Sequence, residues 1–225
     1  MQLKSIARYA FFWTLIIGSI FQSGQTAAAE TPLRANLAPD GYTVGMTTPI
    51  YSQIVFFKLP QVWKSMGEYE QDDHYFLALA PEVQIKNDWK EITVHGFKNL
   101  AKNPQINPIK LLNALAGSMK SQCRDAFSFE SLGDLKIDTY DAHAALIVCG
   151  SMGSESSQSK ITYQIAIKGT NDFYLIDSTV RGAAFAKDNA PISPNTAIDF
   201  LRALQPIKIC DRSEPKNECW ERAAR

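Results

Sequence analysis

The sequence lacks an excess of either charge. Its 23 Lys and Arg residues equal its 23 Asp and Glu residues, and only three histidines are present. Proteins that bind nucleic acid or anionic lipid through surface charge carry a basic face, which this composition does not supply. The sequence also contains neither a P-loop nor a glycine-rich dinucleotide fingerprint. We therefore expect no nucleic-acid partner and no cofactor.

A membrane-spanning run is missing as well. The apolar stretch Ala10–Phe21 is shorter than the roughly 20 residues that a spanning helix needs. It follows Lys4 and Arg8 and precedes the small residues Ala27–Ala29, a pattern typical of a cleaved secretory signal. We predict that residues 1–29 form a signal peptide cleaved near Ala29. The mature chain would then be periplasmic or secreted, without a membrane span.

The remaining chain has the length of one domain. Residues 30–50 mix proline, glycine, threonine and asparagine without a clear period, and this predicts an irregular lead-in. Residues 51–210 contain the predicted strands and helices of a single domain. Residues 211–225 are expected to form a C-terminal tail closed by a disulfide.

The four cysteines contain no C-x₂-C pair, and no histidine lies near them at ligand spacing. A structural zinc site is therefore not expected, and we predict no bound metal. An even number of cysteines in an exported chain indicates disulfides, although four cysteines allow three pairings. Cys210 and Cys219 flank a polar loop that one bridge could close, which leaves Cys123 to pair with Cys149.

Hydrophobic periodicity predicts strands in Ser52–Pro60, in "HYFLALAPE" and in "EITVHGF". A helix should follow, because Asn107 suits the N-cap and Pro108 the first helical position. Its buried stripe would contain Ile109, Leu112, Leu115 and Met119.

The second half of the chain predicts three consecutive strands, "YDAHAALIVCG", "KITYQIAIKG" and "FYLIDSTV". The short turns between them indicate an antiparallel meander. A second helix is expected after Ser193 and Pro194, with Leu201 and Leu204 on its inner face. Strands and helices segregated in this way predict an α+β fold, in which helices pack on an antiparallel β-sheet.

This order of elements resembles that of the PsbP-like superfamily over about residues 50–210. The similarity lies in an early strand pair, a helix, the strand ending near "DAHAALIVCG", the long hairpin after it and a closing helix. The segment "DWKEITV" also resembles a stretch in exported bacterial proteins of this build. The resemblance implies an α/β/α sandwich and a function in docking to partners, and it implies no catalytic residues.

Histidines next to aspartates are the candidates for chemistry. His143 lies two residues after Asp141, so in a strand both would point to one face and could share a proton or a metal. His74 follows Asp72 and Asp73. Ser151, between Gly150 and Gly153, only superficially resembles a hydrolase elbow, because the glycine abuts the serine and a strand follows.

Trp89 and Trp63 are the candidates for a partner surface, since aromatic residues often anchor interfaces. The alternative is that Trp89 covers core side chains at the edge of the sheet. We predict an exported, non-catalytic binding or accessory protein that docks to an envelope or secreted protein, with a small ligand less favoured. The alternative hypothesis is a secreted hydrolase or metal-dependent enzyme that uses His143 with Asp141, or His74 with Asp72.

Overall fold

The computed structural model describes most of the chain after residue 42. The described residues are 36–37, 43–60, 63–83, 89–153, 158–186, 189, 202–214 and 219. The predicted signal peptide and the start of the second predicted helix at Ser193 lie outside them. Among the described residues, no helix is long and apolar enough to cross a membrane.

A seven-stranded antiparallel sheet, called the long sheet below, forms the centre of the molecule. Its strand order is β4-β5-β6-β12-β11-β9-β8. The strands are β4 (Trp63–Gln71), β5 (His74–Pro81), β6 (Trp89–Phe97), β8 (Ser128–Ile137), β9 (Tyr140–Cys149), β11 (Gln158–Lys168) and β12 (Phe173–Ala183). The predicted meander is confirmed, because β9, β11 and β12 are neighbours and pair antiparallel. The predicted strands in "HYFLALAPE" and "EITVHGF" also pair, as β5 and β6.

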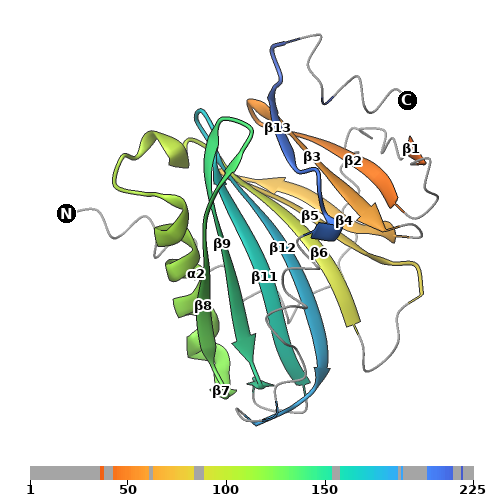
Figure 1. The fold of residues 1–225 in the computed structure, drawn as a ribbon, viewed down its shortest axis with the longest axis vertical. Coiled ribbons are helices and arrows are strands. Elements are labelled where there is room, and N and C mark those ends of the chain that lie inside the picture. The colour runs from red at the N-terminus through yellow and green to blue at the C-terminus, as the bar shows by residue number, and fades with distance from the viewer. Residues whose placement is uncertain are drawn as a thin grey trace.

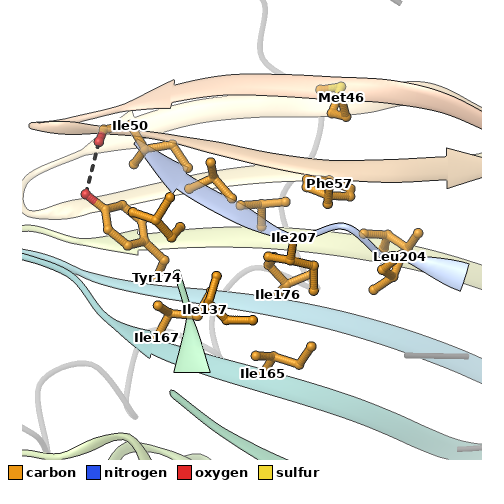
Figure 2. Packing of buried hydrophobic residues seen from close by; sticks show 14 of the residues in the cluster. Met46, Ile50, Phe57, Ile137, Ile165, Ile167, Tyr174, Ile176, Leu204 and Ile207 are labelled. Atoms are coloured by element: carbon orange, nitrogen blue, oxygen red, sulfur yellow. Dashed lines mark hydrogen bonds between the residues drawn. The ribbon is translucent and has the colours of Figure 1, made fainter. Parts of the chain in front are cut away.

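A second, short sheet covers one face of the long sheet. It has the order β1-β2-β3-β13, with β1 (Asn36–Leu37), β2 (Thr43–Ile50), β3 (Gln53–Pro60) and β13 (Lys208–Asp211). Figure 2 shows the core between the two sheets, where Ile50, Phe57 and Ile207 face Ile165 and Ile176. Burial of these side chains is the main stabilising contribution, at about 1.5–3 kcal/mol for each fully buried one.

The helix α2 (Pro108–Gln122) packs on the other face of the long sheet, against β9 and β11. Figure 1 shows it beside β8 and β9, away from the short sheet. Its start is confirmed, because the Asn107 side chain accepts a hydrogen bond from the Lys110 N–H, with Pro108 in the first turn. The buried face of the helix contains Leu111, Leu112, Ala116 and Met119. It shares Leu112 and Met119 with the predicted stripe but has Leu111 and Ala116 in place of Ile109 and Leu115. A 3₁₀ turn, η2 (Leu100–Lys102), leads into the helix.

The predicted α+β class, with helices packed on one antiparallel sheet, is wrong: the described residues form a β-rich sandwich. The layer that covers the inner face of the long sheet is a sheet, in place of the expected helices. Residues 43–50, which show no clear period, form β2, and the ambiguous segment after Pro60 forms β4. Alternation was hard to read there because β4 is exposed on both faces after Trp63. Leu204, expected on the second helix, is buried in the core between the sheets.

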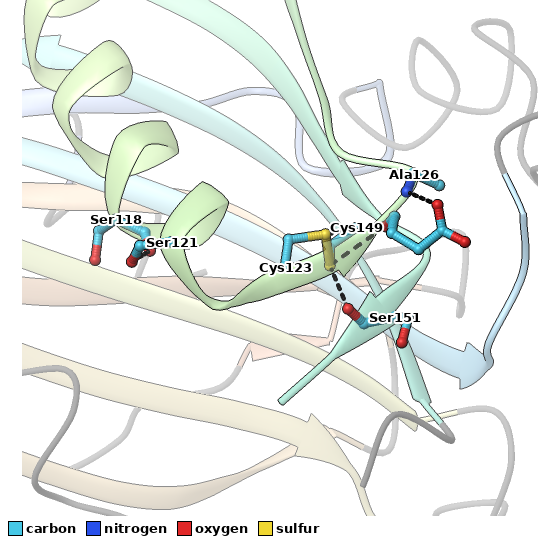
Figure 3. Close-up of a disulfide and its surroundings, with 7 residues drawn as sticks. Ser118, Ser121, Cys123, Ala126, Cys149 and Ser151 are labelled. Atoms are coloured by element: carbon cyan, nitrogen blue, oxygen red, sulfur yellow. Dashed lines mark hydrogen bonds between the residues drawn. A yellow bond between two sulfur atoms is a disulfide. The ribbon is translucent and has the colours of Figure 1, made fainter. Parts of the chain in front are cut away.

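Both predicted disulfides are present, Cys123–Cys149 and Cys210–Cys219. The first joins the short strand β7 (Cys123–Asp125), at the end of α2, to the last residue of β9, as Figure 3 shows. Strand β7 also pairs with β10 (Ser151–Met152). The bridge thereby fastens α2 to the long sheet, and a bridge of this kind typically stabilises a protein by about 2–4 kcal/mol.

Candidate functional site

The long sheet carries a row of buried polar side chains on the face that also bears α2. The strand register places Asp177 of β12 between Thr93 of β6 and Gln164 of β11. One rung further, Thr162 and Thr179 lie opposite each other, with their hydroxyl oxygens 3.0 Å apart. Buried polar groups are costly unless they find hydrogen-bond partners. Such a row inside a sheet is therefore a candidate site.

His74 and His95 converge on this row. His74 Nε2 lies 3.0 Å from His95 Nδ1, and His95 Nε2 lies 3.2 Å from Thr93 Oγ1. Asp177 Oδ2 lies 3.7 Å from the same His95 nitrogen and 3.5 Å from Thr93 Oγ1. We call these four residues the buried histidine network. It runs from His74, which is half-buried on β5, to Asp177 in the middle of the sheet.

Burial determines the charges in this network. Desolvation lowers the pKa of His95 to about 3, and the positive charges of His74 and Lys160 act in the same direction. Desolvation also raises the pKa of Asp177 to about 7, although the ammonium of Lys160 opposes this shift. Near neutral pH, His95 is therefore uncharged, and its contact with Asp177 is not an ion pair.

Gln164 is the neighbour of Asp177 on the next strand of this row. Asp177 Oδ1 and Gln164 Oε1 are both buried without a hydrogen-bond partner. A hydrogen bond between the Gln164 side chain and Asp177 lowers the pKa of Asp177, but desolvation outweighs it. The raised pKa of Asp177 therefore comes from its burial. The network is suited to holding neutral groups in place, and it offers no charged base to a substrate from solvent.

The outer end of the network is aromatic and partly exposed. The His74 ring stacks on the rings of His95 and Phe97, with centroids 5.2 Å apart in each pair. Tyr69 of β4 stacks on Phe76 of β5 at 5.0 Å and meets the His74 ring edge-on. Tyr69 remains 40% exposed. We call Tyr69, His74 and Phe76 the aromatic patch.

His143 lies apart from the other two histidines, on β9 near the opposite edge of the sheet. Its Nδ1 is 2.6 Å from Asp134 Oδ1, and its Nε2 is 2.8 Å from Ser131 Oγ. Both partners come from the edge strand β8. The predicted partner Asp141 forms an ion pair with Lys136 instead. The expected His143–Asp141 pair is therefore wrong. We call Ser131, His143 and Asp134 the edge triad.

The remaining residues singled out from the sequence, Ser151, Trp63 and Trp89, are buried or half-buried. Ser151 is buried in β10, next to the disulfide. Trp63 packs against the core between the sheets. Trp89 begins β6 and is half-buried, and its indole Nε1 is buried without a hydrogen-bond partner. Their roles in partner binding stay predictions. Residues 84–88, which precede Trp89, lie outside the described residues.

Within the part of the chain that the structure describes, no group of three or more His, Cys, Asp or Glu side chains is placed to hold a metal ion. His74 hydrogen-bonds His95, and the preceding residues Asp72 and Asp73 form the exposed turn between β4 and β5. The arrangement thus gives the metal-dependent alternative no ligand set there.

Sequence reasoning missed Asp177, Lys160, Ser131 and Asp134. Asp177 carried a usable signal, because it is the only charged residue in the predicted strand "FYLIDSTV". Ser131 and Asp134 carried none, since residues three apart in a regular strand point to opposite faces. Only the irregular pairing of β8, described below, brings them together.

No protein-family model and no curated protein sequence matches the chain. Among solved structures, the chain is similar to LpqN of Mycobacterium tuberculosis, described as involved in cell envelope biogenesis. That match has a TM-score of 0.41 and 12% identity and covers 76% of this chain and 93% of LpqN. A mutant of the protein Mog1 matches with a TM-score of 0.46 and 10% identity over 75% of this chain and 97% of Mog1. The Saccharomyces cerevisiae Ran-binding protein Mog1p matches with a TM-score of 0.42 and 10% identity, over 71% and 92% of the two chains.

Proposed function

We propose that this protein is an exported binding module that docks a protein partner in the periplasm or outside the cell, through the aromatic patch. Two disulfides support export, because such bridges persist in oxidising compartments. The N-terminal sequence pattern supports it independently. The observation that carries the docking surface is the partly exposed stack of Tyr69 on Phe76, beside His74.

The patch is held in position from below. His74 hydrogen-bonds the buried His95 and stacks on Phe97, which belongs to the core under α2. A partner that binds here meets aromatic rings that are already oriented, so little conformational entropy is lost on binding. Rigid aromatic side chains are among the commonest binding hot spots.

Side chains, and not the backbone of β4, form the proposed contact. Strand β4 is an edge strand, but its pairing with β5 is interrupted by a bulge between Ser65 and Gly67. Charged side chains also alternate along it. Bulges and charges are the usual protection of an edge against added strands. Met66, at the bulge, is 52% exposed and extends the apolar surface of the strand.

The surroundings of the patch are acidic. Asp72 and Asp73 are exposed in the turn between β4 and β5, next to His74, whereas Glu70 lies opposite Tyr75 on the other face of β4. The nearby Lys98 directs its ammonium over the Tyr51 ring, at 5.4 Å. A partner segment that carries Lys or Arg next to an apolar side chain complements this surface, because a cation can lie on an aromatic face as well as pair with a carboxylate.

The mature protein, immobilised and washed with envelope extract, tests this proposal. We expect one protein to be retained and its affinity to fall by about 30-fold or more in Tyr69→Ala, as for a typical hot spot. Retention should also weaken as salt is raised. Val83→Ser is the matched control, because Val83 is 81% exposed but lies outside the patch.

Trp89→Ala separates this surface from the tryptophan predicted from sequence. Retention lost in Trp89→Ala but kept in Tyr69→Ala would move the partner surface to the start of β6. Equal retention by wild type and Tyr69→Ala, with Tyr69→Ala folded, would refute the proposal for the patch. No retention at all would refute the binding function.

A further inference from the structure

We propose that the edge triad is a nucleophilic site that cleaves small carboxylic esters, with Ser131 as the nucleophile. This activity is separate from the proposed partner binding. The triad lies on β8 and β9, whereas the aromatic patch lies on β4 and β5 at the other edge of the long sheet.

The atoms are connected as a nucleophile, base and orienting acid require. A carboxylate only accepts hydrogen bonds, so the 2.6 Å contact places the proton of neutral His143 on Nδ1, which donates to Asp134. Nε2 is then left as an acceptor, and Ser131 Oγ–H donates to it at 2.8 Å. The imidazole can thus take the serine proton as Oγ attacks.

A β-bulge in β8 builds this arrangement. The register runs from Ser131 opposite Ala145 to Gly133 opposite Ala144 and Asp134 opposite His143, so Leu132 has no cross-strand partner. One extra residue inverts the alternation, and Ser131 and Asp134 therefore reach the same side chain although they are three residues apart. Gly133 has φ of 114°, a left-handed conformation that residues with a Cβ rarely adopt.

Access differs along the triad. His143 is buried, with 6% of its side chain exposed, so its orientation is fixed by packing. Ser131 is exposed and can be reached by a substrate. A hollow of about 540 Å³ adjoins Asp134 and is also lined by Leu135, Asp141 and the start of α2 at Pro108 and Ile109. Neither Ser131 nor His143 lines this hollow, so it would hold a part of the substrate away from the bond that is cleaved.

The reaction balances with these groups and water alone. Ser131 Oγ forms a bond to the acyl carbon while its proton passes to His143 Nε2. The C–O bond of the ester then breaks, and the alcohol leaves with that proton. Water repeats the sequence on the acyl-serine and releases the carboxylic acid. The N–H of Leu132, the residue after the nucleophile, is the candidate donor to the oxyanion.

Exposure sets the expected strength of the activity. The Asp134 side chain is 91% exposed, whereas a triad aspartate is usually buried. Water competes for its hydrogen bond to His143 and weakens the orientation that it provides. We therefore assign activated esters as the substrate class and expect no cleavage of amides, which have poorer leaving groups.

The test uses the purified mature protein with a fluorophosphonate probe and, separately, with p-nitrophenyl acetate. We expect one adduct, on Ser131 by peptide mapping, and hydrolysis that falls about 100-fold in Ser131→Ala and in His143→Gln. Ser128→Ala, an exposed serine on the same strand, should react as wild type does. Tyr69→Ala should also react normally, which separates this proposal from partner binding.

Asp134→Asn guards against a folding defect, because an exposed side chain tolerates an isosteric change. It should lower the acylation rate about 10-fold, less than the loss in the buried-aspartate triads. An unlabelled wild-type protein, an adduct elsewhere, or labelling that persists in Ser131→Ala would each overturn the proposal.

Discussion

His95 and His143 lie on the same face of the long sheet, each beside an aspartate and a hydroxyl, yet the two sets of contacts differ. Thr93 and Asp177 approach the same nitrogen of His95, Nε2, while His74 occupies Nδ1. Around His143, the hydroxyl and the carboxylate occupy opposite nitrogens. Only the second arrangement can pass a proton from the hydroxyl to an imidazole that a carboxylate orients.

Burial separates the two regions further. The side chain of Asp177 is 5% exposed and that of Asp134 is 91% exposed. Desolvation raises the pKa of Asp177 and lowers that of His95, so folding favours neutral forms of both. The same residue types therefore serve as a scaffold beneath the aromatic patch and as a reactive group at the open edge. Residue type alone does not decide which role an imidazole takes.

Deletion of Leu132 should change the edge triad more than any other variant proposed here, while it leaves the buried histidine network unchanged. Without the bulge, regular alternation would turn either Ser131 or Asp134 away from His143. We expect the rate of fluorophosphonate labelling of Ser131 to fall at least about 100-fold, as it would if the base His143 were removed. The buried histidine network should stay intact. Labelling rates and near-UV circular dichroism measure the two regions separately. Unchanged labelling would mean that the bulge does not create the site.

In the buried histidine network, His95 and Asp177 should change the free energy of unfolding with pH in opposite directions. The folded-state pKa of His95 is about 3 and the reference value is 6.5, so its contribution to stability is lost as pH falls from about 6.5 towards 3. The folded-state pKa of Asp177 is about 7 and the reference value is 3.8, so its contribution is lost as pH rises from about 4 towards 7. In wild type these two slopes oppose each other between about pH 4 and 6.5.

Single substitutions should reveal each slope. His95→Gln leaves Asp177, so its free energy of unfolding should fall by roughly 3 kcal/mol as pH rises from 4 to 7. Asp177→Asn leaves His95, so its free energy of unfolding should rise by a similar amount over that pH range. His74 contributes in the same direction, because burial lowers its pKa as well. Lys160, with a pKa of about 8, stays charged over this pH range. Glu91 of β6 and Arg181 of β12 are the other charged groups beside the network.

Urea unfolding at several pH values measures the free energy of unfolding of each variant. If it changed with pH in the same direction in both variants, the opposed pKa shifts would be contradicted.

Much of the fold could be predicted from particular residues. Asn107 and Pro108 located the start of α2 because capping chemistry is local. The meander of β9, β11 and β12 followed from short turns, and the disulfide partners followed from their spacing. Strand β4 could not be recognised, because a strand exposed on both faces has no apolar alternation. The short sheet was missed for a related reason, since part of it lies in the unpatterned residues 43–50.

The candidate sites depended on contacts that no local pattern records. The pairing of His74 with His95 joins adjacent strands across a register set by the whole sheet. The His143–Asp141 hypothesis used the correct strand alternation but did not include the neighbouring strand β8. Lys136 of β8 forms the ion pair with Asp141, and Asp134 of β8 contacts His143. The choice between these partners depends on cross-strand register and on one bulge.

Photo-crosslinking from position 69 tests most directly the claim that the exposed end of the buried histidine network meets a partner. A photoreactive phenylalanine analogue would replace Tyr69 in the exported protein, and a matched sample would carry it at Val83, which is more exposed but outside the patch. We predict a discrete protein adduct from position 69 that is absent from position 83 and weakened by salt. The same adducts from both positions, or none from position 69, would contradict the proposed docking surface.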